Sequence, residues 1–226
     1  MMDRTTSRQK VLKRVCQATS TAADSGPALA QAYAALPRNY VRSGAMTMGE
    51  RVERMIERLR EYDACVVESL PHELPSAIAA RLEASGHRTF VAPAGVPADW
   101  LAPAYEWKID HELAVAEIEQ ADGVVTAAFC GIAESGTIVL HHGPMEGRRV
   151  LSLLPDWHLC ILRASQVVET LPEYFARCRR APALVTWISG PSATADIEMT
   201  RIKGVHGPRF LDVIMVRDEG TRQNPN

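Results

Sequence analysis

A chain of 226 residues is long enough to bury one large hydrophobic core without help from metals or disulfides. Hydrophobic residues make up 46% of the sequence and charged residues 23%, which is ordinary for a globular protein. The formal net charge of −2 indicates no basic surface, so nucleic acid is not an expected partner.

Residues 1–60 are expected to form a helical N-terminal segment. Apolar residues within 11–16 recur at helical spacing, and Pro27 favours the first turn of a second helix that ends before Pro37. A third helix is indicated most clearly, because Thr47 and Glu50 fit the T-x-x-E capping box. Four apolar residues of one helical face follow this box: Val52, Met55, Ile56 and Leu59.

Residues 61–217 are expected to form an α/β domain, and residues 218–226 a polar, frayed tail. Strands are predicted at 64–67, 89–91, 124–129, 137–141, 150–153, 159–162, 184–188 and 211–216. Helices are predicted at 75–84, ended by Gly86, at 110–118, capped by Asp110, and at 171–178; residues 95–107 are expected to be a loop. Interleaved strands and helices favour a mainly parallel sheet covered on both faces, and the cluster between 124 and 162 adds an antiparallel portion.

The five cysteines are scattered and form no C-x-x-C pair. We therefore expect no metal site, no iron–sulfur cluster and no cofactor, and the pattern favours a reducing compartment. No run approaches the ~20 apolar residues that span a bilayer, and residues 1–10 lack the apolar core of a secretory signal. The predicted localisation is cytoplasmic.

The first stretch that could carry chemistry is Gly131-Ile-Ala-Glu-Ser-Gly-Thr-Ile-Val-Leu140. Glu134 could act as a general base or bind a hydroxyl, and Gly136 would let a ligand approach the backbone. The alternative is a hairpin turn, in which serine and glycine are expected for conformational reasons alone. The spacing favours neither interpretation.

The second stretch is Ile188-Ser-Gly-Pro-Ser-Ala-Thr-Ala-Asp-Ile-Glu198, an apolar segment that enters a turn. Ligands of open α/β sheets gather outside the carboxyl ends of strands, and a helix N-terminus would suit an anion. Asp196 and Glu198 would repel a phosphate, however, and could bind hydroxyls or pair with Lys203 instead. An ordinary helix start capped by Thr194 is the alternative.

The third stretch is Lys203-Gly-Val-His-Gly-Pro208, where two glycines flank His206. This histidine could serve as an acid or base near neutral pH, or could simply be exposed. Weaker indications are His141, His142 and His158, which hint at a metal, and Cys130, which is better explained as a buried thiol.

These stretches, together with Leu153-Leu-Pro-Asp156, resemble the LUD domain, and within it the lactate utilization protein C family, over roughly residues 60–216. The resemblance implies an α/β fold like that of ribose phosphate isomerase, glucosamine-6-phosphate deaminase and the CoA transferases. It also implies a non-redox role in oxidising L-lactate to pyruvate beside iron–sulfur partner proteins. The rival hypothesis is a free-standing isomerase or transferase on small phosphorylated or acyl substrates, with Glu134 as nucleophile or base, and a third is a binding module that senses a metabolite.

By the same resemblance, a small-molecule pocket would combine two candidate catalytic residues, Glu134 and His206, with a set of ligand-binding residues. Those ligand-binding residues are Ser135, Gly136, Thr137, Gly190, Ser192, Thr194 and Asp196. We expect Glu134 and Asp196 to share one cleft at the ends of neighbouring strands. A basic residue is expected after Ser192, but Ala193 stands there, which argues against strong phosphate binding.

Overall fold

The computed structural model describes residues 4–18, 26–178, 182–194, 202–203 and 206–217. The chain divides into two compact units, Met1–Tyr40 and Val41–Asn226. The first unit contains helices α1 (Arg4–Ala18) and α2 (Gly26–Ala34), as the sequence predicts. The second unit contains all the strands that the structure describes. The expected tail at 218–226 lies outside the described residues.

The centre of the second unit is a six-stranded sheet in which every neighbouring pair is parallel. Its order is β1-β12-β7-β4-β2-β3. The strands are β1 (Cys65–Ser69), β2 (Thr89–Pro93), β3 (Glu106–Asp110), β4 (Gly123–Ala127), β7 (Trp157–Arg163) and β12 (Phe210–Val216). The predicted α/β class with a mainly parallel sheet is therefore confirmed.

A second sheet of four short strands has the order β8-β5-β6-β9. It is formed by β5 (Cys130–Ile132), β6 (Thr137–Leu140), β8 (Val167–Val168) and β9 (Thr186–Ile188). Both pairs that involve β6 are antiparallel, which is the antiparallel portion expected after residue 124. A separate two-stranded hairpin joins β10 (Ala193–Thr194) and β11 (Ile202–Lys203).

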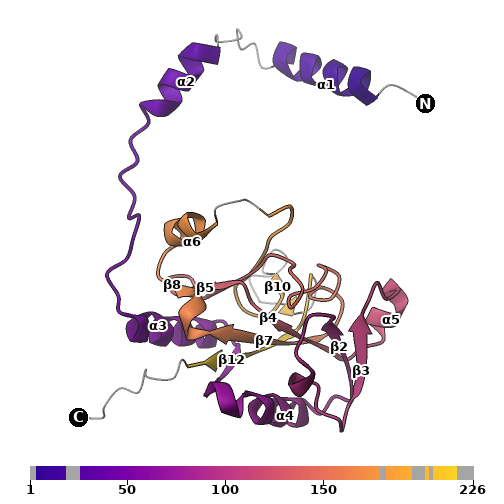
Figure 1. Ribbon diagram of the computed structural model, residues 1–226. Helices are drawn as coiled ribbons and strands as arrows, with labels where there is room; N and C mark the ends of the chain where they lie inside the picture. The colour runs from indigo at the N-terminus through magenta and orange to yellow at the C-terminus, as the bar shows by residue number, and fades with distance from the viewer. Residues whose placement is uncertain (1–3, 19–25, 179–181, 195–201, 204–205, 218–226) are drawn as a thin grey trace. The chain divides into compact units, whose positions relative to one another are not determined.

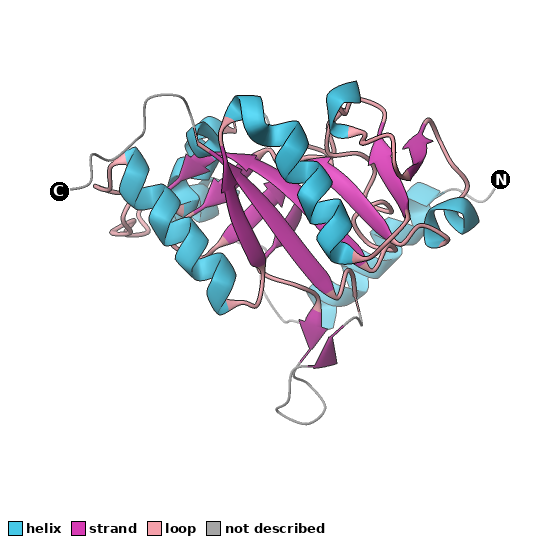
Figure 2. Ribbon diagram, turned by 90° about the horizontal axis from the view of Figure 1, so that it is seen from below, coloured by secondary structure: helices cyan, strands magenta, loops and turns pink. Residues whose placement is uncertain are grey.

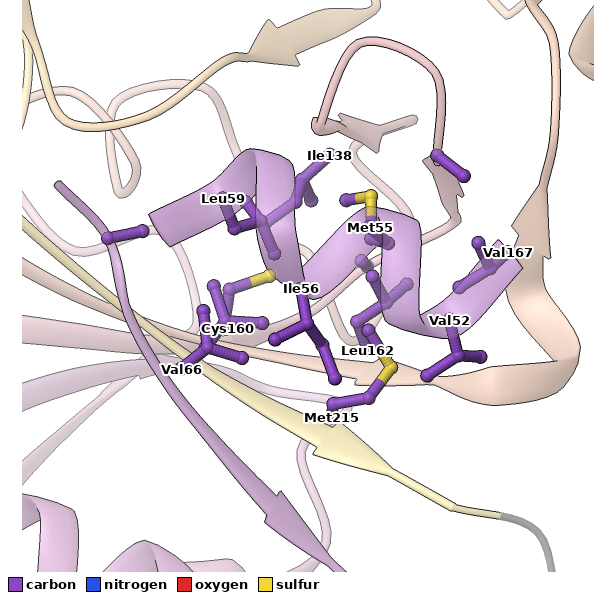
Figure 3. Packing of buried hydrophobic residues seen from close by; sticks show 14 of the residues in the cluster. Val52, Met55, Ile56, Leu59, Val66, Ile138, Cys160, Leu162, Val167 and Met215 are labelled. Atoms are coloured by element: carbon purple, nitrogen blue, oxygen red, sulfur yellow. The ribbon is translucent and has the colours of Figure 1, made fainter. Parts of the chain in front are cut away.

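Helix α3 (Met48–Glu61) fills the space between the two sheets. Thr47 caps it through the predicted capping box, in which the Thr47 hydroxyl accepts from the Glu50 N–H and the Glu50 carboxylate accepts from the Thr47 N–H. The four predicted face residues are all buried and pack against both β7 and the β5–β6 hairpin (Figure 3). This helix, which the sequence analysis assigned to the N-terminal segment, belongs to the core of the second unit.

The opposite face of the six-stranded sheet is covered by α4 (Leu74–Ser85), so that α3 and α4 lie on opposite sides of the strands (Figure 1). Leu74, Ile78 and Leu82 are buried against Leu159 and Ile161 of β7. As predicted, Gly86 ends α4 in the left-handed conformation, with φ of 72°. Helix α5 (Val115–Glu119) packs through Ile118 on Val91 and Val124, and α6 (Leu171–Arg177) packs on β5 and β8 of the second sheet. Figure 2 shows helices lying across the strands of the domain.

Three predicted elements are wrong. Residues 150–153 form turns instead of a strand, because the buried Leu151 packs onto Val91 and Val124 from outside the sheet. Asp110 is the last residue of β3 rather than a helix cap, so the helix expected at 110–118 is reduced to α5. The loop expected at 95–107 already enters β3 at Glu106.

No helix in the described part of the chain combines the length and the apolar character needed to cross a membrane.

Candidate functional site

The first two candidate stretches lie side by side in the second sheet. Residues 133–136 form the turn of the β5–β6 hairpin, and β6 pairs with β9, which places Ile138 opposite Ile188. A chain of hydroxyl groups joins the two stretches: Thr137 Oγ1 lies 2.8 Å from both Ser135 Oγ and Ser189 Oγ. Strand pairing therefore brings together residues that are about fifty positions apart in the sequence.

Glu134 occupies the tip of this hairpin and is exposed. Its backbone N–H donates to the Glu169 carbonyl at 3.0 Å, while its carboxylate makes no hydrogen bond or ion pair with any residue that the structure describes. Gly136 has φ of 62°, and an added Cβ would lie 2.6 Å from Cβ of Arg58 on α3. In this structure the glycine allows the hairpin to pack on α3, as the turn interpretation requires.

The third stretch meets the second at Ser192. The Ser192 N–H donates to the Pro208 carbonyl at 2.9 Å, and the Ser192 hydroxyl accepts from the His206 backbone N–H at 3.0 Å. Gly190 adopts φ of 80° and approaches Tyr62, the residue after α3. These contacts fix residues 190–192 between α3 and the loop that precedes β12.

A pocket of about 220 Å³ opens where these segments meet. It is lined by residues 186–192 and 206–208, together with Arg149, Ser152, His158 and Leu211. His158 and Leu211 are each the second residue of their strand, so the pocket lies at the amino ends of β7 and β12. The pocket also lies at the carboxyl end of β9, the strand for which the sequence suggested a ligand, because the turn that follows β9 forms part of its lining.

The predicted site residues thus fall into three groups. Gly190, Ser192 and His206 line the pocket. Ser135 and Thr137 are connected to it through Ser189, whereas Glu134 and Gly136 are not among its lining residues. The structure places Thr194 in β10, and Asp196 lies outside the described residues, so its expected proximity to Glu134 stays a prediction.

His158 is buried and lines the pocket with an uncharged imidazole ring. Burial, followed by the positive charge of Arg149, lowers the pKa of His158 to about 4. Its Nε2 lies 2.8 Å from the Thr126 hydroxyl. The imidazole is therefore uncharged at neutral pH and fixed in orientation by its neighbour on β4.

Arg149 supplies the positive charge of the pocket. Its side chain is half-buried, and Nη1 donates to the Ser152 hydroxyl at 3.1 Å. Burial lowers the pKa of this guanidinium, which stays protonated because arginine titrates so far above neutrality. Arg149 was not among the site residues predicted from the sequence. The doubled arginine at 148–149 is the signal that could have indicated it, because Arg148 alone pairs with Asp110.

The two histidines and the cysteine that the sequence suggested for metal or thiol chemistry are instead engaged in packing and hydrogen bonds within the domain. His141 stacks on Phe129 and lies within 2.8 Å of the Tyr174 hydroxyl, while His142 hydrogen-bonds Thr186. Burial raises the pKa of the Cys130 thiol to about 11. No cluster of three or more potential metal ligands occurs among the residues that could be described.

Comparison with known proteins now identifies the family. The model of the LUD domain matches residues 98–216, more than half of the chain. Lactate utilization protein C of Deinococcus radiodurans is 41% identical over 175 residues, a match that covers 76% of this chain and 82% of that protein. The chain belongs to the LUD domain family.

A solved LUD-type neighbour supports the same assignment. The crystal structure of a DUF162 family protein from Deinococcus radiodurans superposes with a TM-score of 0.63 at 37% sequence identity, covering 76% of this chain and 99% of that one. Lactate utilization protein C of Bacillus subtilis is 36% identical over 53% of this chain and 54% of its own length. The uncharacterized protein YkgG of Escherichia coli is 40% identical over 46% and 48%.

The described pocket lies entirely within the matched LUD domain, since its lining residues run from Arg149 to Leu211. Helix α3 precedes the match, and Tyr62, the residue that follows this helix, lies close to Gly190 of the pocket lining. The LUD domain therefore contains the pocket-lining residues, and the α3 helix helps to hold the β5–β6 and β9 segments in place.

Proposed function

We propose that this LUD domain protein is a non-redox component of an L-lactate utilisation system and acts with iron–sulfur partner proteins that oxidise lactate to pyruvate. The observation that carries the proposal is the 41% identity to lactate utilization protein C of Deinococcus radiodurans over 76% of the chain. The matches to the Bacillus subtilis and Escherichia coli relatives cover only about half of those proteins, so the role rests mainly on the first relative.

The chemistry of the cysteines supports a division of labour. Oxidation of lactate releases two electrons, and cofactors normally accept them. The five cysteines of this chain are scattered and form no C-x-x-C pair of the kind that holds an iron–sulfur cluster. We therefore propose that electron transfer belongs to the partner proteins.

An exposed aromatic surface supports a role in partner binding. Phe175 on α6 is 60% exposed and Trp187 on β9 is 43% exposed, and their ring centroids lie 6.4 Å apart. Leu171 and Leu184 are exposed as well. Aromatic residues gathered on a surface are typical of protein–protein contacts.

The rival function, an isomerase or transferase with Glu134 as nucleophile or base, gains less support. Such a residue must reach the substrate, within hydrogen-bond distance of the reacting atom. Glu134 is at the exposed hairpin tip, and the described pocket is lined by other residues. The geometry therefore favours the partner role over this one.

Growth tests the proposal directly. Deletion of the gene from its host should abolish growth on L-lactate as the carbon source while growth on glucose continues, and a plasmid copy should restore it. A deletion strain that grows normally on L-lactate would contradict the proposed function.

A further inference from the structure

Arg149 is a half-buried cation without a carboxylate partner among the described residues. Its hydrogen bond there goes to a neutral hydroxyl, Ser152 Oγ, at 3.1 Å. Six other arginines, by contrast, each pair with an aspartate or glutamate: Arg54, Arg58, Arg81, Arg148, Arg209 and Arg217. Desolvating a charge without a counter-charge is unfavourable, and a bound anion removes that penalty. The guanidinium has five N–H donors, enough to hold a carboxylate through two parallel hydrogen bonds.

Among the arginine, lysine, aspartate and glutamate residues that the structure describes, the pocket lining matches a monoanion better than a dianion. Arg149 is the sole arginine or lysine among the described lining residues, and none of those residues is aspartate or glutamate. The buried ring of His158 adds no charge, because its pKa lies near 4. A phosphate monoester carries about −1.5 to −2 charges at neutral pH and would call for a second cation. A carboxylate, with one charge, matches one guanidinium.

The size and the walls of the pocket suit a small acid. The pocket has a volume of about 220 Å³ and is partly open to solvent, which leaves room for a small organic acid. The hydroxyls of Ser152 and Ser192 provide polar contacts beside Arg149, and Ile188 and Leu211 provide an apolar wall. An acid with a few carbon atoms and a polar substituent would use both surfaces.

We propose that this pocket binds a small monoanionic carboxylate, with Arg149 holding the carboxylate group. The proposal goes beyond the proposed function, which assigns no ligand to this chain; only the choice of L-lactate and pyruvate as first probes rests on that function. Arg149 is the anchor, and Ser152 and Ser192 orient the remainder of the acid.

The test is an NMR titration of the full chain with L-lactate, with pyruvate and with inorganic phosphate at low ionic strength. Wild type is compared with Arg149→Gln, Arg149→Lys and Arg54→Gln. The last is a charge-matched control, because Arg54 lies on α3 in an exposed pair with Glu57. We expect a carboxylate to bind more tightly than phosphate and Arg149→Gln to weaken binding at least tenfold. Arg149→Lys, which keeps the charge but not the two-pronged geometry, should weaken it less, and Arg54→Gln should not change it.

Three results would overturn the proposal: no carboxylate binding, tighter binding of phosphate, or unchanged binding in Arg149→Gln. If Arg149→Gln does not fold, Arg149→Lys provides the test. Binding of the carboxylate to Arg149→Lys with wild-type affinity would contradict the role of the guanidinium. The outcome is separable from the growth test. Carboxylate binding by a chain that is dispensable for growth on lactate would overturn the proposed function alone, and a required chain that binds no carboxylate would overturn the pocket proposal alone.

Discussion

At the scale of single residues, Gly86 and Gly136 have nearly the same backbone conformation but different surroundings. Comparing them distinguishes the cost of backbone strain from the cost of a steric clash. Gly86 and Gly136 have φ of 72° and 62°. An added Cβ would meet nothing within 4 Å at Gly86 but would lie 2.6 Å from Cβ of Arg58 at Gly136. The first position requires only conformational freedom, whereas the second also requires space.

Gly136→Ala should therefore destabilise the protein more than Gly86→Ala. We expect a loss of about 1–2 kcal/mol at Gly86 from left-handed strain alone. At Gly136 the clash with α3 should raise the loss to about 2–4 kcal/mol. Urea unfolding of both variants measures the difference, and equal losses would show that the hairpin can move away from α3 at little cost.

Glu134 should contribute charge to the surface and little to stability. Because its side chain is exposed and forms no ion pair with a described residue, Glu134→Gln should change the free energy of unfolding by less than about 0.5 kcal/mol. Carboxylate binding in the pocket should also stay at the wild-type level. A melting temperature lowered by many degrees, or a weakened ligand, would contradict the turn assignment.

At the scale of elements, strand β7 contains a titratable side chain, His158, that is buried in the core. The folded protein keeps His158 neutral with a pKa of about 4, whereas the unfolded chain protonates it below about 6.5. The unfolded state therefore binds more protons as the pH falls from 6.5 to 4, and stability decreases over that window.

The wild type should lose about 2 kcal/mol more stability between pH 7 and pH 5 than a variant without this group. His158→Gln is suitable because its amide can still hydrogen-bond Thr126. Urea unfolding at the two pH values, for both proteins, gives the comparison, and other titrating groups cancel because they are common to both. The same pH dependence in both proteins would show that His158 is not held neutral in the fold.

Sequence periodicity predicted those elements whose local signals agree with their tertiary surroundings. The capping box at Thr47, the buried face of α3 and the left-handed Gly86 were all readable because each depends on near neighbours in the chain. The apolar residues at 150–153 led to the wrong prediction of a strand, because Leu151 is buried as part of a turn. Edge strand β3 was missed because its residues are only partly apolar and follow a proline-rich loop.

The pocket was only partly predictable, for a related reason. Gly190, Ser192 and His206 belong to glycine-containing stretches that stand out in a single sequence. Arg149 and His158 depend on the pairing of distant strands, and neither sits in a recognisable motif. Which arginine of the pair 148–149 lacks a described carboxylate is decided by Asp110, a contact 38 positions away. No local pattern contains that information.

At the scale of the whole molecule, the aromatic surface on α6 and β9 should carry part of the partner contact. Phe175→Ser should reduce the amount of iron–sulfur partner that co-purifies with the chain, while the melting temperature stays near the wild-type value because the ring is exposed. Val115→Ser is the matched control, since Val115 is 57% exposed on α5, which lies well apart from α6 in Figure 1. Equal co-purification of both variants would place the contact elsewhere.

Reconstitution of lactate oxidation tests the central claim most directly. The chain and its iron–sulfur partners are purified separately, and the L-lactate-dependent reduction of an electron-accepting dye is measured for each protein alone, for the partners together and for the complete mixture. We predict no activity from this chain alone and a clear increase when it is added to the partners. Lactate oxidation by the isolated chain, or full activity of the partners without it, would contradict the account.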